Sequence, residues 1–354
     1  MNQNPPGVDG IDVRRAGSEL PITSPDWFDI TPESFGADRA AITGRVRIGV
    51  PSGWRVEQRS PLHWRVHVGE VDLDRWVCLR LAIWDRGHTT HLWQRCLPVR
   101  LWVRSTFDID RHTFPMRNSS RVLGDVRGSQ AAFRETYRGM PARVGSLLFH
   151  GLYRDIVYIG GSGEHRGGLC SGMARWAGLR ALHDDDADVP MVAALREITK
   201  LHGRQLLDRA LLESAIWFLR GSSRSAYRVV RDDMLRTGRS TSALDLRIPI
   251  PWRRDVLTSL VGDGHTVVPY EIEQFDPDTA IVTVYDPNRG REPQEMRFDL
   301  RRDRYAFRHM VSLDDSKYGL IAIRHVAYAT PGTAYLAAIG SMFWRFLRDK
   351  RDSK

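Results

Sequence analysis

The chain has 354 residues, of which 42% are hydrophobic and 27% charged, and it contains eleven tryptophans. This composition is typical of a globular protein and excludes an intrinsically disordered one. The formal net charge is +9, but only four of the 52 basic residues are lysines, and the arginines are spread along the whole chain with aspartates between them. No continuous phosphate-binding track is indicated, so nucleic-acid binding stays only a weak alternative, and nucleic acid is an unlikely partner.

Three cysteines, Cys78, Cys96 and Cys170, are too few for a disulfide framework in a chain of this length, which favours a reducing compartment. The N-terminal residues lack the apolar core of a signal peptide, and no run approaches the ~20 apolar residues that span a bilayer. We therefore expect a soluble cytoplasmic protein, although export without a cleaved signal peptide would leave no trace in the sequence.

The N-terminal part of the chain divides into two segments. Residues 1–40 hold prolines, glycines and aspartates without a sustained period, and we expect an irregular segment there. Residues 41–110 contain short runs in which apolar and polar side chains alternate, as in half-buried strands. These runs are ITGRVRIGV, HWRVHVG, RWVCLRLAIWD and HLWQRCLPVRLWVRS. The pattern predicts a β-rich accessory domain, either a small antiparallel sheet or a β-sandwich.

The next part of the chain, residues 111–330, combines helical and strand patterns. Apolar spacing near 3.6 predicts helices in four segments, 129–140, 190–203, 204–221 and 225–238. Strand patterns then return in LDLRIPI, HTVVPYEI, AIVTVYD and YGLIAIRHVAY. Helices followed by antiparallel strands predict an α+β domain.

Residues 331–354 predict an amphipathic helix with a basic tail. Seven large apolar side chains fall on one helical stripe that is too short to span a bilayer, namely Tyr335, Leu336, Ile339, Met342, Phe343, Phe346 and Leu347. Docking of this stripe on the protein's own core is the simplest expectation. A groove on a partner protein and a membrane interface are the alternatives.

A single cysteine stands between a glycine-rich loop and a predicted helix in the stretch GSGEHRGGLCSGMARWAGLRAL. A helix N-terminus and a neighbouring histidine lower the pKa of a cysteine thiol from about 8.5 and favour the reactive thiolate. Gly167 and Gly168 allow the backbone to approach closely just before Cys170. The residue is therefore a candidate nucleophile, and the alternative is a small buried hydrophobic residue.

A second group of candidate residues lies in the stretch GDGHTVVPYEIEQFDPDTAIVTVYDPNRG. His265 opens one apolar strand, Asp286 closes the next, and EQFDPD supplies turn residues between them. The midpoint between His265 and Asp286 falls inside this turn, so a simple antiparallel hairpin places the two residues side by side. The carboxylate can then bind one imidazole nitrogen and leave the other for the thiol proton. The structural alternatives are a histidine that is solvated or satisfied as a structural residue, and an ordinary turn at the aspartate.

These motifs together resemble the papain-like cysteine hydrolases. GGLCSGM before a helix, GHTVV on a strand and TVYDPNRG on the next resemble especially the bacterial branch with a GLCGGM-type nucleophile loop and a YDPN-type acid motif. The resemblance covers roughly residues 145–328. It implies an α+β papain-like fold and a cysteine-dependent hydrolase, a peptidase or amidase, that acts on a peptide or protein substrate through an acyl-enzyme and needs no cofactor. Cys170 would be the nucleophile, His265 the general base and then acid, and Asp286 the orienting residue, with Asn288 a secondary candidate for that role.

One position departs from the pattern of this family. Papain-like enzymes usually carry a glutamine a few residues before the nucleophile, and its amide donates into the oxyanion hole. Here Glu164 stands six residues before Cys170, and an ionised carboxylate cannot donate a hydrogen bond. His165 and Arg166 are the candidates to replace the glutamine, beside the backbone N–H of Cys170. The same departure supports the alternative of a non-catalytic papain-like scaffold that binds proteins.

A metal site is not expected. His88, His91 and Cys96 lie near one another in the sequence, but no second cysteine or acidic ligand follows at a standard spacing. We interpret the two histidines as residues of a surface hairpin.

Overall fold

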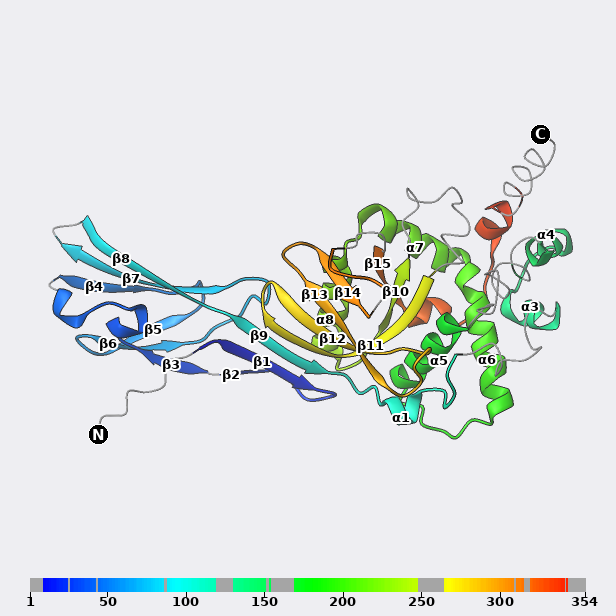
Figure 1. Cartoon of the computed structure of the whole chain (residues 1–354), viewed down its shortest axis with the longest axis horizontal. Coiled ribbons are helices and arrows are strands. Elements are labelled where there is room, and N and C mark those ends of the chain that lie inside the picture. The colour runs from blue at the N-terminus through cyan, green and yellow to red at the C-terminus, as the bar shows by residue number, and fades with distance from the viewer. Residues whose placement is uncertain are drawn as a thin grey trace. The chain divides into compact units, whose positions relative to one another are not determined.

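The computed structural model describes residues 9–24, 26–42, 44–85, 88–118, 130–150, 153, 169–247, 264–308, 310–314, 319–340 and 342. The described residues form a mixed structure with helices and several sheets, as expected for an α+β protein. The chain divides into two compact units (Figure 1). The first comprises residues 1–15, 19–103 and 273–280, and the second comprises 16–18, 104–272 and 281–354.

The first unit is built from short strands. They are β1 (Ile11–Ala16), β2 (Ile22–Ser24), β3 (Trp27–Ile30), β4 (Arg45–Gly49), β5 (Arg55–Ser60), β6 (His63–His67), β7 (Val77–Asp85), β8 (His88–Leu97) and β9 (Val99–Arg104). Two three-stranded sheets have the orders β3-β6-β5 and β4-β7-β8, and β1 lies between β9 and β2. Two short 3-10 helices, Pro32–Phe35 and Arg39–Ala41, connect β3 to β4.

Alternation along the strands explains the core of this unit. Val77, Leu79, Leu81 and Ile83 of β7 are all buried, whereas Arg80 between them is exposed. These residues meet side chains of the other sheet, including Trp64 and Val66 of β6, in one hydrophobic cluster. The period-two pattern therefore predicted these strands correctly. The expectation of an irregular segment at residues 1–40 was wrong, because β1, β2 and β3 lie within these residues.

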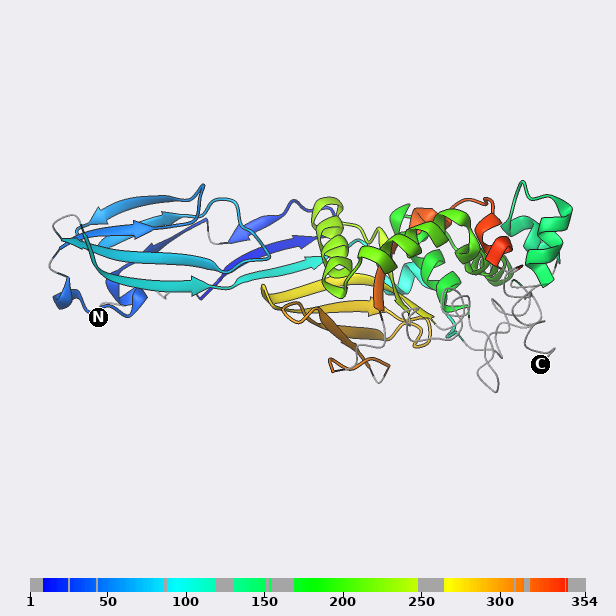
Figure 2. The same cartoon turned by 90° about the horizontal axis from the view of Figure 1, so that it is seen from above.

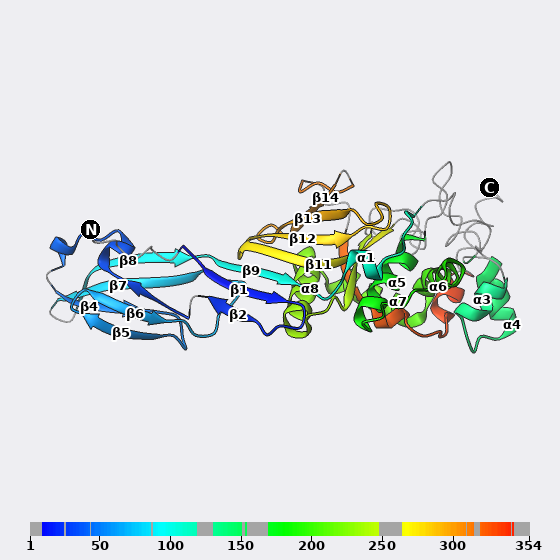
Figure 3. The same ribbon diagram turned by 90° about the horizontal axis from the view of Figure 1, so that it is seen from below.

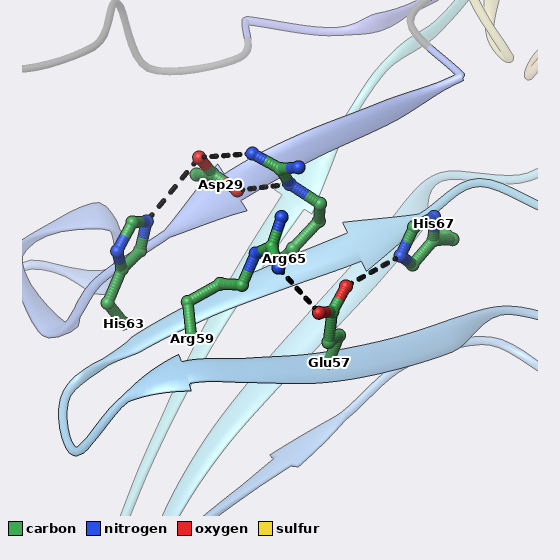
Figure 4. Close-up of polar contacts among 6 residues, drawn as sticks. All are labelled: Asp29, Glu57, Arg59, His63, Arg65 and His67. Atoms are coloured by element: carbon green, nitrogen blue, oxygen red, sulfur yellow. Dashed lines mark hydrogen bonds and ion pairs between the residues drawn. The ribbon is translucent and has the colours of Figure 1, made fainter.

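The outer face of the β3-β6-β5 sheet is polar (Figure 4). Arg65 donates two hydrogen bonds to Asp29, at 2.9 and 3.2 Å, and its guanidinium lies 3.6 Å from the ring centroid of Trp27. The hydrogen bond from Arg65 lowers the pKa of Asp29 in spite of some burial. Glu57 of β5 pairs with Arg59 and faces His67 of β6. Cross-strand ion pairs of this kind suit a solvated sheet face.

The first unit contains one disulfide bond, although three cysteines had favoured a reducing compartment. Cys78 of β7 and Cys96 of β8 are directly paired in the antiparallel register, with their Cα atoms 4.0 Å apart, and they form a disulfide. The hairpin rule applied above to His265 and Asp286 would have paired these two cysteines as well. The argument for a reducing compartment therefore fails. All three cysteines lie within the described residues, and Cys170 is the free one.

The second unit combines helices with strands. Its helices are α1 (Ile109–His112), α3 (Gln130–Thr136), α4 (Ala142–Leu148), α5 (Cys170–Leu182), α6 (Met191–Gly203), α7 (Asp208–Arg220) and α8 (Ser223–Thr237), with 3-10 turns at Arg204–Leu206 and His325–Tyr328. Its strands are β10 (Ser242–Arg247), β11 (Gly264–Asp276), β12 (Thr279–Tyr285), β13 (Pro293–Asp299), β14 (Arg304–Phe307) and β15 (Gly319–Arg324). The four helices and four strands predicted after residue 110 are present, although the last strand ends at Arg324 and a 3-10 turn follows it. The helix α4 and the strands β13 and β14 were missed.

The strands of the second unit form one sheet, in which β14, β13, β12 and β11 lie side by side in that order (Figure 3). β10 continues the sheet from β11, and β15 pairs with β10. Figure 2 shows the green helices of this unit on one side of the yellow and orange strands. The start of β11, the end of β12 and the start of α5 all belong to the second unit.

Helix α5 is buried on nearly every side. Met173 and Trp176 pack in a cluster with α6, and Ala174 and Ala177 pack in another cluster with Val268 of β11. Gly172 is required for the approach of α6, because a Cβ at this position would lie 2.2 Å from the carbonyl oxygen of Ile198. A helix enclosed in this way holds its first residue in a defined place.

The C-terminal helix packs differently from the prediction. Its described part, residues 335–340 and 342, has Ala337 and Ala338 in the core cluster, whereas the large side chains of Tyr335, Leu336, Ile339 and Met342 are 39% to 57% exposed. The expectation that the large apolar stripe docks on the protein's own core is therefore wrong for these residues. Phe343, Phe346 and Leu347 lie outside the described residues. Among the described residues, no helix is long and apolar enough to cross a membrane.

This packing leads to a prediction about stability. The double variant Leu336→Glu/Ile339→Glu should change the free energy of unfolding by no more than ~0.5 kcal/mol, because both side chains face solvent. Ala338→Glu should lower it by more than about 2 kcal/mol, because the carboxylate enters an apolar cluster. Thermal unfolding followed by circular dichroism compares the two. The reverse order of effects would show that the large stripe is the buried one.

Candidate active site

The candidate nucleophile lies at the start of a helix. Cys170 is the first residue of α5 and is half-buried. The first backbone N–H groups of a helix have no acceptor within it, and together with the helix dipole they favour a negative charge. The thiol is therefore in the environment that the sequence predicted. The glycine-rich loop before it, with Gly167 and Gly168, lies outside the described residues.

The hairpin predicted for the other two candidates is present. His265 is near the start of β11, and Asp286 directly follows the end of β12. His265 is 4% exposed and Asp286 is fully buried, and the imidazole Nε2 lies 2.8 Å from the carboxylate Oδ1. The burial of His265 and its contact with Asp286 argue against a solvated histidine. Asp286 also accepts the backbone N–H of Asn288, as a turn aspartate does.

Cys170 and His265 meet although they are far apart in the chain. Burial by itself lowers the pKa of His265. The hydrogen bonds with Asp286 and Cys170 and the charge of Cys170 outweigh this effect, and they raise the pKa to about 10. Since Nε2 faces Asp286, Nδ1 is the ring nitrogen left for the sulfur. The imidazole therefore lies between a thiol and a carboxylate and is stabilised as imidazolium.

Asp286 is held by more than the histidine. Its Oδ1 also accepts the backbone N–H of Asn288 at 2.8 Å, and its Oδ2 accepts a hydrogen bond from Arg308 at 2.9 Å. Burial raises the pKa of Asp286, but the hydrogen bond and charge of His265, the Asn288 N–H and Arg308 together lower it. The carboxylate thus stays ionised in a buried place and fixes the orientation of the imidazole.

Two neighbouring residues of the site were missed by sequence reasoning. Phe307, the last residue of β14, stacks on the imidazole of His265 with ring centroids 6.2 Å apart. Arg308 follows with a positive φ of 52°, and this turn carries its guanidinium to Asp286. No motif marks either residue, because their roles depend on the pairing of β14 with β13, and both strands were missed.

Asn118 connects the residue before the nucleophile to the turn that follows Asp286. It was not identified from the sequence. Its Oδ1 accepts the backbone N–H of Leu169 at 2.7 Å, directly before Cys170. Its Nδ2 donates to Oδ1 of Asn288 at 2.7 Å, and its backbone N–H donates to the carbonyl oxygen of Pro287 at 2.9 Å. The side chain of Asn288 is thus bonded to Asn118, and Asp286 is the residue that orients His265.

The remaining candidates are placed as follows. Glu164, His165 and Arg166 lie outside the described residues. His88 and His91 are on β8. Cys96 forms the disulfide bond with Cys78. In the part of the chain that the structure describes, no three His, Cys, Asp or Glu residues are grouped to hold a metal ion.

Comparisons with known proteins give no relative for this site. No protein-family model matches the chain, and neither the curated proteins nor the solved structures contain a significant match. What the site can do must therefore be argued from its groups. A thiol at a helix N-terminus, an imidazole and a buried carboxylate form the set needed for nucleophilic catalysis.

Proposed function

We propose that the protein is a cysteine-dependent hydrolase, a peptidase or amidase, whose second unit is a papain-like domain. The observation that carries the proposal is the contact of His265 with both Cys170 and Asp286 inside one unit. These three residues come from the start of α5, the start of β11 and the end of β12. Strongly perturbed titratable groups arranged in this way are concentrated at catalytic sites.

The reaction follows from the order of the three groups. The Cys170 thiol gives its proton to Nδ1 of His265, and the sulfur attacks the carbonyl carbon of an amide. The carbonyl π electrons move to oxygen, and when they return, the C–N bond breaks and the imidazolium protonates the leaving amine. Water then attacks the thioester and gives its proton to His265. The C–S bond breaks, the carboxylic acid leaves, and the proton returns to the sulfur.

The surroundings of His265 support this role. Asp286 keeps its negative charge because Arg308 and the N–H of Asn288 bind it. It holds the ring so that one nitrogen always faces the sulfur. Phe307 covers a face of the imidazole and limits its contact with water. A buried carboxylate behind the base and an aromatic ring over it favour proton transfer between sulfur and substrate over exchange with solvent.

A second candidate function belongs to another class. Glu164 stands where papain-like enzymes carry the oxyanion glutamine, which favours a non-catalytic scaffold that binds peptides. Such a scaffold would keep the fold without efficient turnover. The two functions differ in whether the sulfur forms an acyl bond.

Cleavage of a peptide library made from a digested proteome tests the proposal. New peptide termini, identified by mass spectrometry, are expected with the wild type and absent with Cys170→Ala, because only the sulfur can form the acyl-enzyme. Peptides retained equally by both proteins without cleavage would support the scaffold instead. The same termini from both proteins would exclude Cys170 as nucleophile.

A further inference from the structure

The proposed hydrolase needs a side chain that donates to the oxyanion, and the sequence offers no glutamine for this purpose. The residues considered in its place, His165 and Arg166, precede Cys170 in the sequence and lie outside the described residues. Asn118 comes from a different part of the chain. Its carboxamide lies against the backbone of Leu169, one residue before the nucleophile.

The orientation of this carboxamide is determined by its partners. A backbone N–H can only donate, so the oxygen of Asn118 faces Leu169 and the NH2 group faces Asn288. The NH2 group has two hydrogens, and the bond to Asn288 uses one of them. The backbone N–H of Cys170, at the first position of α5, lacks an acceptor within the helix. The carboxamide of Asn118 and the backbone N–H of Cys170 therefore both lie at the start of α5.

We propose that Asn118 is the side-chain donor of the oxyanion hole and acts with the backbone N–H of Cys170. This assignment rests on the proposed hydrolase function and adds a catalytic residue to it. The hydrogen bonds to Leu169, Asn288 and Pro287 hold the carboxamide in place before substrate binds. Such preorganisation is what makes an oxyanion donor effective. It also removes the need for a donor at the position of Glu164.

Two reactions of the Cys170 sulfur distinguish an oxyanion donor from a residue that changes the reactivity of the thiolate in general. Acetyl transfer from 4-nitrophenyl acetate forms a C–S bond and breaks the ester C–O bond, and the carbonyl oxygen passes through an oxyanion. Iodoacetamide alkylation displaces iodide at a saturated carbon and forms no oxyanion. The ratio of the two rates at Cys170 therefore reports the oxyanion donor and cancels changes in thiolate reactivity.

Two variants of Asn118 are expected to lower this ratio. Asn118→Ala should reduce it by about 10²–10³, the usual effect of losing one oxyanion donor. Asn118→Asp should reduce it at least as much, because a carboxylate has no N–H. The aspartate can still accept the N–H of Leu169 and a hydrogen bond from a turned Asn288 amide, so the bridge is kept. Asn288→Ala removes one of the hydrogen bonds that hold the carboxamide but leaves the donor itself, so its ratio should fall by less than that of Asn118→Ala.

The outcomes distinguish the two proposals. If the wild type is acetylated rapidly and both Asn118 variants keep its ratio, Asn118 is not the donor and the hydrolase proposal is unaffected. If Asn118→Asp behaves as wild type and only Asn118→Ala is impaired, the residue merely holds the two turns together. If wild-type Cys170 is acetylated no faster than in the urea-unfolded chain, the hydrolase proposal fails, and this assignment fails with it.

Discussion

Replacing His265 with alanine is expected to slow the alkylation of Cys170 by iodoacetamide at pH 6 roughly tenfold or more and to lower peptide hydrolysis by about 10⁴-fold. The imidazole is the group that takes the thiol proton. Its pKa is raised to about 10 by Asp286 and Cys170 in spite of burial. The imidazolium therefore persists below that pH and stabilises the thiolate. Without it, a thiol with the ordinary pKa of about 8.5 is almost entirely protonated at pH 6.

The pH dependence gives this prediction a second readout. In the wild type the alkylation rate should depend on pH less steeply between pH 6 and pH 9 than in the variant, because His265, whose pKa is raised to about 10, keeps a positive charge beside the sulfur over this interval. In His265→Ala the rate should instead rise steadily over this interval. Mass spectrometry locates the adduct without ambiguity, because Cys78 and Cys96 are paired.

A suitable control for this experiment is His183→Ala. His183 follows the last residue of α5 at the end opposite to Cys170 and is exposed. It should leave both profiles unchanged. Identical profiles for the wild type and His265→Ala would mean that the imidazole does not activate the sulfur, and the hydrolase proposal would lose its base.

The three central residues could be predicted because each is marked by local pattern. Cys170 follows glycines and begins an apolar helix, whereas His265 opens one strand and Asp286 closes the next, with a short turn between the strands. The period of two and the turn position determine that the last two are neighbours. The contact of His265 with Cys170 is long-range and could be expected only from the resemblance to a known family.

Asn118, Phe307 and Arg308 could not be predicted in the same way. Each reaches the site through a contact between distant segments. Arg308 depends on a left-handed turn after β14, and a non-glycine residue gives little local signal for that conformation. Asn118 depends on where the chain passes before α3. Local patterns do not report such positions.

The C-terminal helix shows a limit of amphipathic patterns. The stripe of Tyr335, Leu336 and Ile339 is more hydrophobic than the alanine face, and yet the alanine face is buried. Small side chains allow a helix backbone to come close to a packed surface. A pattern that ranks faces by hydrophobicity alone cannot detect this preference for close packing.

The largest effect on stability is expected at a buried ion pair that anchors α5. Arg175 is fully buried and donates to both carboxylate oxygens of Asp245 on β10 at 2.9 Å, and it donates to the carbonyl oxygen of Ile323 on β15 at 2.7 Å. Its guanidinium lies 4.2 Å from the ring centroid of Tyr328. Asp245→Ala should lower the free energy of unfolding by about 3–5 kcal/mol, because it leaves the arginine buried without its counter-ion.

The unpaired buried charge of Arg175 leads to a second expectation for a double variant. If the penalty comes from the unpaired charge, Arg175→Met/Asp245→Leu should recover much of it, since an apolar pair of similar volume carries no desolvation cost. Glu135→Ala, which breaks an ion pair with the exposed Arg196, should cost less than about 1 kcal/mol. Urea unfolding followed by tryptophan fluorescence measures all three variants. Should Asp245→Ala prove as mild as Glu135→Ala, the pair does not anchor α5, and the placement of Cys170 must depend on the apolar packing of Met173, Trp176 and Ala177 alone.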